Sequence, residues 1–182
     1  MDHDPDISLV RRFKEGDEKA FDHIVRRYQD RLYHVALRMV SDHDDAIDIT
    51  QDAFIKAYKG LRRFREDSSL YTWLYRIVVN LSINHQRIHR LRRFVSFKDV
   101  KSSLLSTKDS PDEITEGADL GRAVDEAIES LPEKQKAVFI LRYYQGLSHR
   151  EISEVLGSSI GTVKANYFHA LKKLRKRLKE FR

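Results

Sequence analysis

Between residues 68 and 93 the chain contains no Gly or Pro, and its apolar side chains recur at the spacing of one face of an α-helix. That face is made of Leu70, Leu74, Ile77, Val78, Leu81, Ile88 and Leu91. Ser68 or Ser69 can cap the start by accepting a hydrogen bond from a backbone N–H group. The pattern predicts one long amphipathic helix, around which we expect the rest of the chain to be arranged.

A second set of side chains runs along the flank of this face. It combines guanidinium groups, side-chain amides and an indole ring: Thr72, Trp73, Arg76, Asn80, Asn84 and Arg87. The helix then ends among further arginines, the last of them Arg93. Such a surface suits a polyanion whose bases can be stacked on and hydrogen-bonded. A core helix with a solvated basic end explains this segment equally well.

Apolar residues at helical spacing continue through most of the remaining chain. They predict helices in residues 6–39 and 42–60, and again in residues 120–131, 132–145, 148–156 and 159–178. Residues 94–120 lose this period and are rich in Ser, Lys and Asp, which indicates a flexible linker. We therefore predict an all-α fold of two small helical domains, residues 1–93 and 121–182, joined by residues 94–120.

The net charge of +6 is unevenly distributed. Residues 61–93 carry 8 basic and 2 acidic side chains and residues 121–182 carry 13 and 7, so each region has a net charge of +6. Residues 1–60 and residues 94–120 each carry −3. Basic regions attract phosphates, so the acidic regions point to a different partner.

The composition also excludes several classes of protein. There is no Cys, which excludes disulfides and thiolate metal sites. No apolar run approaches the ~20 residues of a membrane span, and the polar N-terminus is no signal peptide. We expect a cytoplasmic protein with no direct membrane insertion.

The most specific pattern lies between residues 148 and 178. Ser148 and Glu151 form a capping box, Gly157 allows a sharp turn, and Ser159 caps a second helix. This is the pattern of a helix-turn-helix, whose second helix enters the major groove of DNA. The side chains expected outside its apolar face are Thr162, Lys164, Ala165, Phe168, His169 and Lys172. A helical hairpin that binds protein is the alternative, and the basic tail favours DNA.

Acidic side chains recur on the helix predicted for residues 42–60. Asp45, Asp48 and Asp52 share one face, and acids near a helix start are favoured by its dipole, so a solvated, well-capped end is one interpretation. Their number exceeds what capping requires. His43 lies among them, but hard-cation sites usually use a glycine-bearing loop, so we expect no metal here.

Two further features could form a base-stacking site and a metal site. Phe64, between two arginines ahead of Trp73, would stack on a single-stranded base if exposed, although a single Phe is more often buried in the core. His85 and His89 are four residues apart, but no Cys or nearby carboxylate completes a metal site, so we expect a solvated pair.

Two motifs, in this order, resemble a known family. Residues 45–80 resemble conserved region two of bacterial sigma factors, through the motifs Asp45-Ala46-x-Asp48-x-x-Gln51-x-x-Phe54 and Thr72-Trp73-Leu74-Tyr75-Arg76-Ile77, followed by Asn80. Residues 131–175, which begin LPEKQKAVFILRYYQGLSHREISEVLG, are similar to region four. At 182 residues the chain is too short for the additional domains of housekeeping sigma factors, so it resembles the two-domain extracytoplasmic-function (ECF) group.

The resemblance implies a promoter-specificity subunit that binds core RNA polymerase, recognises the minus-thirty-five and minus-ten promoter elements and promotes DNA melting, in a stress or envelope response. Contacts with the polymerase, through its largest-subunit clamp and its flap, would involve Asp45, Asp48, Gln51, Asp52, Phe54, Ile55 and Tyr58. The minus-ten element would be bound by Arg63, Phe64, Arg65, Trp73, Arg76, Asn80, Asn84 and Arg87. The minus-thirty-five element would be bound by Ser159, Gly161, Thr162, Lys164, Ala165, Phe168, His169 and Lys172. An anti-sigma factor, often membrane-anchored, would hold the protein inactive.

The alternative is a helix-turn-helix regulator that binds DNA alone, with residues 1–93 as a dimerisation or sensing module. The acidic helix and the Phe64–Trp73 pair argue against it. An enzyme is the third possibility. The chain has no phosphate-binding glycine loop, nucleophile elbow or HExxH motif, so we expect neither catalytic activity nor a cofactor.

Overall fold

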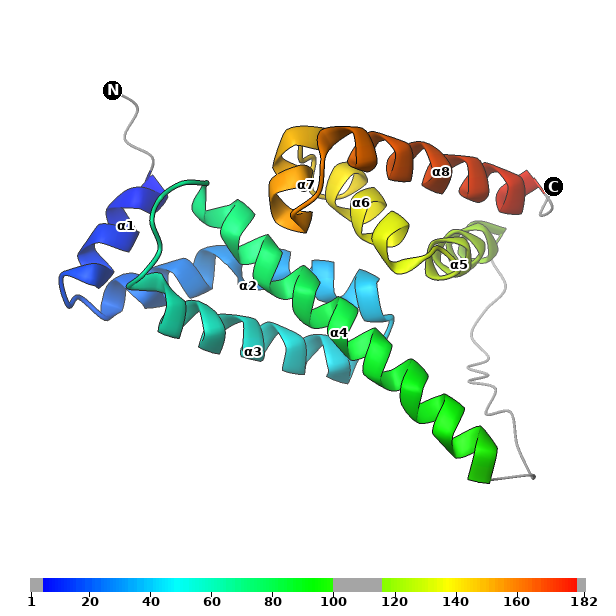
Figure 1. Ribbon diagram of the computed structural model, residues 1–182, viewed down its shortest axis with the longest axis horizontal. Coiled ribbons are helices and arrows are strands. Elements are labelled where there is room, and N and C mark those ends of the chain that lie inside the picture. The colour runs from blue at the N-terminus through cyan, green and yellow to red at the C-terminus, as the bar shows by residue number, and fades with distance from the viewer. Residues whose placement is uncertain (1–4, 100–115, 180–182) are drawn as a thin grey trace.

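The computed structural model describes residues 5–99 and 116–179 (Figure 1). Over these residues the chain forms eight helices and no strand, so the predicted all-α fold is confirmed. The helices are α1 (Pro5–Lys14), α2 (Lys19–Val40), α3 (His43–Leu61), α4 (Leu70–Asp99), α5 (Glu116–Glu129), α6 (Glu133–Tyr143), α7 (His149–Leu156) and α8 (Ile160–Lys179).

Helices α1 to α4 form the first group. Their buried faces carry the apolar residues that recur at helical spacing, among them Phe13, Ile24, Leu32 and Leu74. Helix α2 packs against both α3 and α4, and α1 closes one end of the group. Asp42 caps α3 by accepting a hydrogen bond from the backbone N–H of Asp45 at 3.0 Å. The predicted helices of residues 6–39 and 42–60 are therefore present.

Helix α4 begins as predicted but is longer. The Ser69 side chain accepts a hydrogen bond from the backbone N–H of Thr72 at 3.3 Å, which confirms Ser69 as the cap. The predicted apolar face is buried at Leu70, Leu74 and Val78 and half-buried at Ile77 and Leu81. It is exposed further along, at Ile88 and Leu91. The helix runs to Asp99, past the predicted end at Arg93, because no Gly or Pro interrupts it there.

Helices α5 to α8 form the second group. Pro132 precedes the first turn of α6, where its missing N–H leaves no helical hydrogen bond unmade. The capping box at Ser148 and Glu151 starts α7, and Gly157 ends it with φ +58°, a left-handed conformation that favours glycine. Ser159 then accepts a hydrogen bond from the Thr162 N–H at 3.1 Å to start α8. The helix-turn-helix prediction is confirmed.

The two groups pack against one another. Helix α7 contacts α4 and α6 contacts α2, so that one cluster of buried apolar side chains includes residues of both groups (Figure 1). The predicted linker of residues 94–120 is helical at both ends, since α4 reaches Asp99 and α5 begins at Glu116. Its middle, residues 100–115, lies outside the described residues.

None of the helices in the described part of the chain combines the length and the apolar composition needed to cross a membrane.

Candidate functional site

The acidic face predicted for polymerase binding lies on α3. Asp48, Gln51 and Asp52 are exposed, and Ile55 beside them is 51% exposed. Asp45 and Phe54 are half-buried. The opposite side of α3 is buried through small residues, Ala46, Ala53 and Ala57. These alanines let α3 pack closely on α2 and α4, and the larger Ile49 and Leu61 are buried on the same side. Ile55 and Tyr58, both exposed, form an apolar centre with a rim of carboxylates, which is the composition of a protein-binding surface.

Tyr58 marks one edge of the acidic face. Its hydroxyl donates a hydrogen bond to the Glu18 carboxylate at 3.0 Å, and its ring meets Phe13 and Phe21 edge-on at centroid distances of 5.2 and 5.1 Å. The hydrogen bond to Glu18 raises the pKa of the Tyr58 hydroxyl. These contacts hold the Tyr58 side chain in one position, although it is exposed.

Phe64 is not an exposed stacking platform. It is only 8% exposed and packs on Trp73 with ring centroids 5.2 Å apart, so the alternative of a core position is confirmed. The loop is folded back onto α1, because Lys14 Nζ donates to the Phe64 carbonyl at 2.6 Å. Lys14 and Arg11 also bind the Glu66 carboxylate, at 3.4 and 3.2 Å. These contacts turn the Phe64 ring inward.

A cavity of about 270 Å³ opens beside this aromatic pair. It is lined by Arg63, Phe64, Arg65, Asp67, Ser68, Trp73, Arg76 and Glu154. Pockets for drug-sized ligands have volumes of about 300 Å³ or more. This cavity is slightly smaller, and a single nucleobase is smaller than a drug-sized ligand, so one flipped base fits its size. The half-buried Trp73 provides a flat wall and three arginines provide positive charge. Predicted minus-ten residues that are apart in sequence are thus brought together here.

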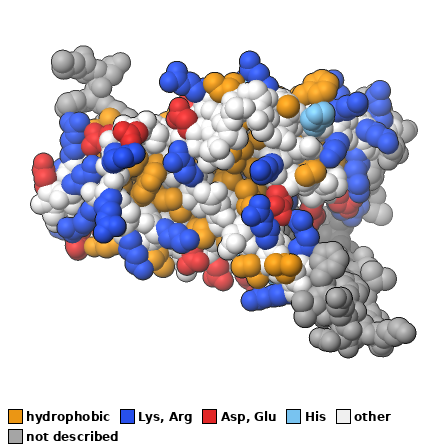
Figure 2. Space-filling model, in the orientation of Figure 1, with side chains coloured by type: hydrophobic (Ala, Val, Ile, Leu, Met, Phe, Trp, Pro, Cys, Tyr) orange, Lys and Arg blue, Asp and Glu red, His pale blue; other side chains and the backbone are white. Residues whose placement is uncertain are grey.

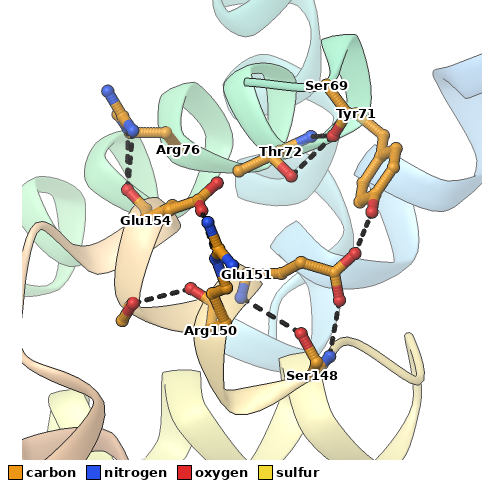
Figure 3. Close-up of polar contacts among 9 residues, drawn as sticks. Ser69, Tyr71, Thr72, Arg76, Ser148, Arg150, Glu151 and Glu154 are labelled. Atoms are coloured by element: carbon orange, nitrogen blue, oxygen red, sulfur yellow. Dashed lines mark hydrogen bonds and ion pairs between the residues drawn. The ribbon is translucent and has the colours of Figure 1, made fainter. Parts of the chain in front are cut away.

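The flank of α4 carries the other predicted minus-ten residues. Arg76, Asn80, Asn84 and Arg87 are exposed, whereas Thr72 is buried. The second helix group already engages two of these arginines. Arg76 donates two hydrogen bonds, of 3.1 and 2.7 Å, to the backbone carbonyl of Glu154 on α7 (Figure 3). The Arg87 guanidinium lies 3.5 Å from the Glu133 carboxylate on α6.

The predicted minus-thirty-five residues lie between Ser159, just before α8, and Lys172, in its second half, and all eight are exposed. Phe168 is 64% exposed although its side chain is apolar. Val163, Ala170 and Leu174 form the buried face of the helix. Basic side chains gather over the α8 end of the molecule (Figure 2), as phosphate binding requires. A helix-turn-helix that offers an exposed, basic second helix can enter a major groove.

The side chains that join the two groups were not identified from the sequence. Tyr75 donates a hydrogen bond to the Gln145 side chain at 2.7 Å, and Tyr71 donates one to Glu151 (Figure 3). Lys136 donates to the Met39 carbonyl at 2.7 Å. These residues sit within ordinary helical patterns, so no sequence signal distinguishes them from core or surface positions.

The two histidines of α4 are not an isolated solvated pair. His85 Nε2 lies 3.2 Å from an Asp45 carboxylate oxygen, and the His85 and His89 ring centroids are 5.2 Å apart. The expectation that no carboxylate lies nearby is wrong, because the packing of α3 on α4 brings the first turn of α3 alongside His85.

Comparison with protein families finds two matches in order along the chain. Residues 24–92 match the family model described as Sigma-70 region 2, and residues 121–174 match Sigma-70, region 4. The matched residues contain α3 and most of α4 in the first case and the helix-turn-helix in the second.

Relatives of similar length match along almost all of the chain. The RNA polymerase sigma-H factor of Pseudomonas aeruginosa is 36% identical over 98% of this chain and 96% of its own length. The ECF RNA polymerase sigma-E factor of Haemophilus influenzae is 36% identical over 91% of this chain and 90% of its own. Among solved structures, the sigma factor RpoE of Bartonella quintana, in complex with the anti-sigma factor NepR, covers 90% of this chain and 99% of its own, with 25% identity and a TM-score of 0.69.

Proposed function

The chain belongs to the ECF group of the sigma-70 family, and from that premise we propose how its surfaces divide the work of a promoter-specificity subunit. As such a subunit it binds core RNA polymerase and promoter DNA, and the chemistry of transcription belongs to the polymerase. The stand-alone regulator is not favoured, because the region 2 match covers the segment that alternative would use for dimerisation or sensing. We propose no enzymatic activity for the chain itself.

In this proposal the domains are residues 1–93 and 121–182, and each has its own DNA-binding surface. The acidic face of α3 (Asp45, Asp48, Gln51, Asp52, Phe54, Ile55 and Tyr58) binds the polymerase clamp. The wall of the cavity formed by Trp73 and the arginines, together with the flank of α4, binds the opened minus-ten element once α7 has moved away. The exposed face of α8 binds the minus-thirty-five duplex. The observation that carries this division is the exposure of apolar side chains within both charged faces, Ile55 on α3 and Phe168 on α8.

Two simultaneous DNA contacts require the helix groups to separate. The minus-thirty-five and minus-ten elements lie about 25 base pairs apart, or roughly 85 Å of duplex at about 3.4 Å per base pair. Helix α4, the longest helix of the described residues, has 30 residues and is only about 45 Å long. The closed arrangement also places Glu154 of α7 against Arg76, inside the minus-ten surface. We propose that polymerase binding opens the protein, and that the closed arrangement is its inactive form.

An inhibitory protein partner fits the same geometry. The Bartonella relative is bound to an anti-sigma factor, and we propose that this protein has one as well. Such a partner would stabilise the closed arrangement or cover the α3 face. We place the protein in the cytoplasm, with the polymerase, and at the inner membrane face whenever its anti-sigma factor is membrane-anchored.

Run-off transcription with core polymerase tests the division of labour. Asp48→Arg combined with Gln51→Ala should abolish co-elution with the polymerase and all transcription, because charge reversal opposes a basic partner. Lys164→Ala with His169→Ala should weaken minus-thirty-five duplex binding by about 1–3 kcal/mol per base contact. Asn80→Ala should impair transcription only from templates that are not pre-melted.

Asp30→Arg, an exposed charge reversal on α2, is the matched control for the Asp48 and Gln51 double variant. Undiminished co-elution of the Asp48 and Gln51 double variant would rule out the α3 assignment.

A further inference from the structure

We propose that Asp45, His85 and His89 form a binding site for a first-row transition metal ion of the Zn²⁺ class. One ligand atom from each residue lies within 4.8 Å of the other two. The site would join the first turn of α3 to the exposed half of α4. It involves no residue of the DNA-binding surfaces and stands whether or not the α3 face binds polymerase.

The local structure explains why these three side chains converge. His85 and His89 are one helical turn apart, so both rings project from the same face of α4. Their ring planes differ by only 34°. Asp45 lies in the first turn of α3, where the helix dipole favours the charged carboxylate that a metal requires. Asp42, the neighbouring acid, is already used as the cap of that helix.

The distances suit a shared ion. Ligands of tetrahedral Zn²⁺ lie at about 2.0–2.2 Å from the metal, which separates them from one another by about 3.4 Å. The 3.2 Å between His85 Nε2 and the Asp45 carboxylate is close to this value. His89 is exposed, so its ring can turn toward the other two without disturbing packed neighbours.

The surroundings leave room for an ion and for water. The three residues line a cavity of about 420 Å³ that α6 closes from the other helix group. Two cations line it as well, but each has a partner: Arg90 is paired with Glu133, and Lys136 donates to the Met39 carbonyl. Glu129 adds negative charge to the same wall. Water can therefore complete the coordination of a divalent ion.

The donor set indicates the class of metal. Two imidazoles and one carboxylate suit Zn²⁺, Co²⁺, Ni²⁺ or Cu²⁺, whereas Mg²⁺ and Ca²⁺ require oxygen ligands. The chain has no Cys to provide thiolates. The ordinary alternative is a His85–Asp45 ion pair with His89 as a bystander. The two interpretations differ in what they predict for His89, because only the metal site needs it.

Metal titration of the full-length, untagged protein tests the proposal, after treatment with a chelator. We expect ZnCl₂ to bind one ion per chain by calorimetry, CoCl₂ to give a visible d–d absorption, and Zn²⁺ to raise the melting temperature. His89→Gln and Asp45→Asn should each lower the Zn²⁺ affinity by about tenfold or more, as even outer partners of metal ligands contribute 10–100-fold. Asn keeps the shape of Asp45, His89 is exposed, and circular dichroism without metal verifies that both variants fold.

His23→Gln is the matched control, because His23 is exposed near the start of α2, away from the cluster. We expect it to bind Zn²⁺ as the unmodified protein does. The proposal is overturned if His89→Gln binds Zn²⁺ as tightly as the unmodified protein, or if the unmodified protein shows no one-to-one binding.

Discussion

At the scale of single residues, Lys136 is the clearest link between the two helix groups. It lies on α6, is only 2% exposed, and its ammonium group donates to the Met39 carbonyl near the end of α2. A cation at a helix C-terminus is favourable, but burial opposes the charge and lowers the pKa of Lys136. The hydrogen bond from Lys136 to the Met39 carbonyl exists only while the two helix groups are in contact, so it stabilises the closed arrangement.

Replacement of Lys136 should therefore favour the open arrangement. Lys136→Met keeps the length of the side chain but removes this donor. Because Gln86 Nε2 still donates to the Met39 carbonyl, we expect closure to weaken by about 0.5–1.5 kcal/mol, the net value of one hydrogen bond. Limited proteolysis between the two groups would report the opening as faster cleavage. Lys134→Met, an exposed position on the same helix, is the control and should be cleaved at the original rate. Equal rates for Lys136→Met and the unmodified protein would argue against this link.

The Tyr71–Glu151 contact makes closure sensitive to acid. The hydrogen bond from Tyr71 is the main cause that lowers the pKa of Glu151 below its ordinary value of 4.5, with a further contribution from the Ser148 backbone N–H. A carboxyl group with a lowered pKa stabilises the structure above its ordinary pKa, and this contribution is lost as the pH falls through the lowered value. Closure should therefore weaken as the pH drops below about 4.5.

Glu151→Gln separates this effect from general acid unfolding. Glutamine still completes a capping box, so α7 should remain folded, but it has no charge to lose. The distance between the helix groups, followed against pH, should change less between pH 6 and pH 3 in this variant than in the unmodified protein, a window of about 1.5 units on either side of the ordinary pKa of 4.5. The same pH profile for both proteins would contradict the role assigned to Glu151.

At the scale of helices, α3 and α4 meet closely at Gly60. A Cβ atom added there would lie 3.1 Å from Trp73 Cζ2, so this glycine allows the indole ring to form one wall of the cavity. The position of the ring therefore depends on a residue of a different helix. Trp73 is the only tryptophan of the chain, which makes its fluorescence a direct probe of that position.

Gly60→Val should displace the Trp73 ring. We expect a shift in its emission and a loss of about 1–3 kcal/mol in the free energy of unfolding, as for other overpacked sites. Gly121→Val is the matched control, since no heavy atom lies within 4 Å of an added Cβ there. An unchanged emission spectrum in Gly60→Val would show that the ring is not held against α3.

The sequence predicts helices better than it predicts their surroundings. The helix starts at Ser69, Ser148 and Ser159 are correct, because a cap depends on residues within one turn. The anchoring of the Phe64 loop on α1, the exposed end of α4 and the Asp45–His85 contact were not predicted. Each depends on where a second helix lies. Helix α1 anchors the Phe64 loop, and among the described residues no neighbour covers Ile88 or Leu91. Helical periodicity identifies an apolar face but not how far along the helix a partner covers it.

At the scale of the whole molecule, the arrangement of the two groups decides whether DNA can be bound. The resemblance to sigma factors indicated both DNA-binding surfaces. Nothing in either motif indicates that α7 packs on α4 or that the Glu154 carbonyl accepts hydrogen bonds from Arg76. Helix α4, the longest of the described helices, is only about half as long as the distance between the two promoter elements. The central claim is therefore that the free protein is closed and that polymerase holds it open.

A distance measurement across the interface tests this claim most directly. The chain has no Cys, so Asp30→Cys on α2 and Arg150→Cys on α7, both exposed, provide the only two sites for spin labels or fluorophores. We predict one narrow distance distribution for the free protein and a clearly longer distance in the complex with core polymerase. The Asp48→Arg and Gln51→Ala double variant should keep the short distance in the presence of polymerase. The same distribution in the free protein and in the polymerase complex would contradict the claim.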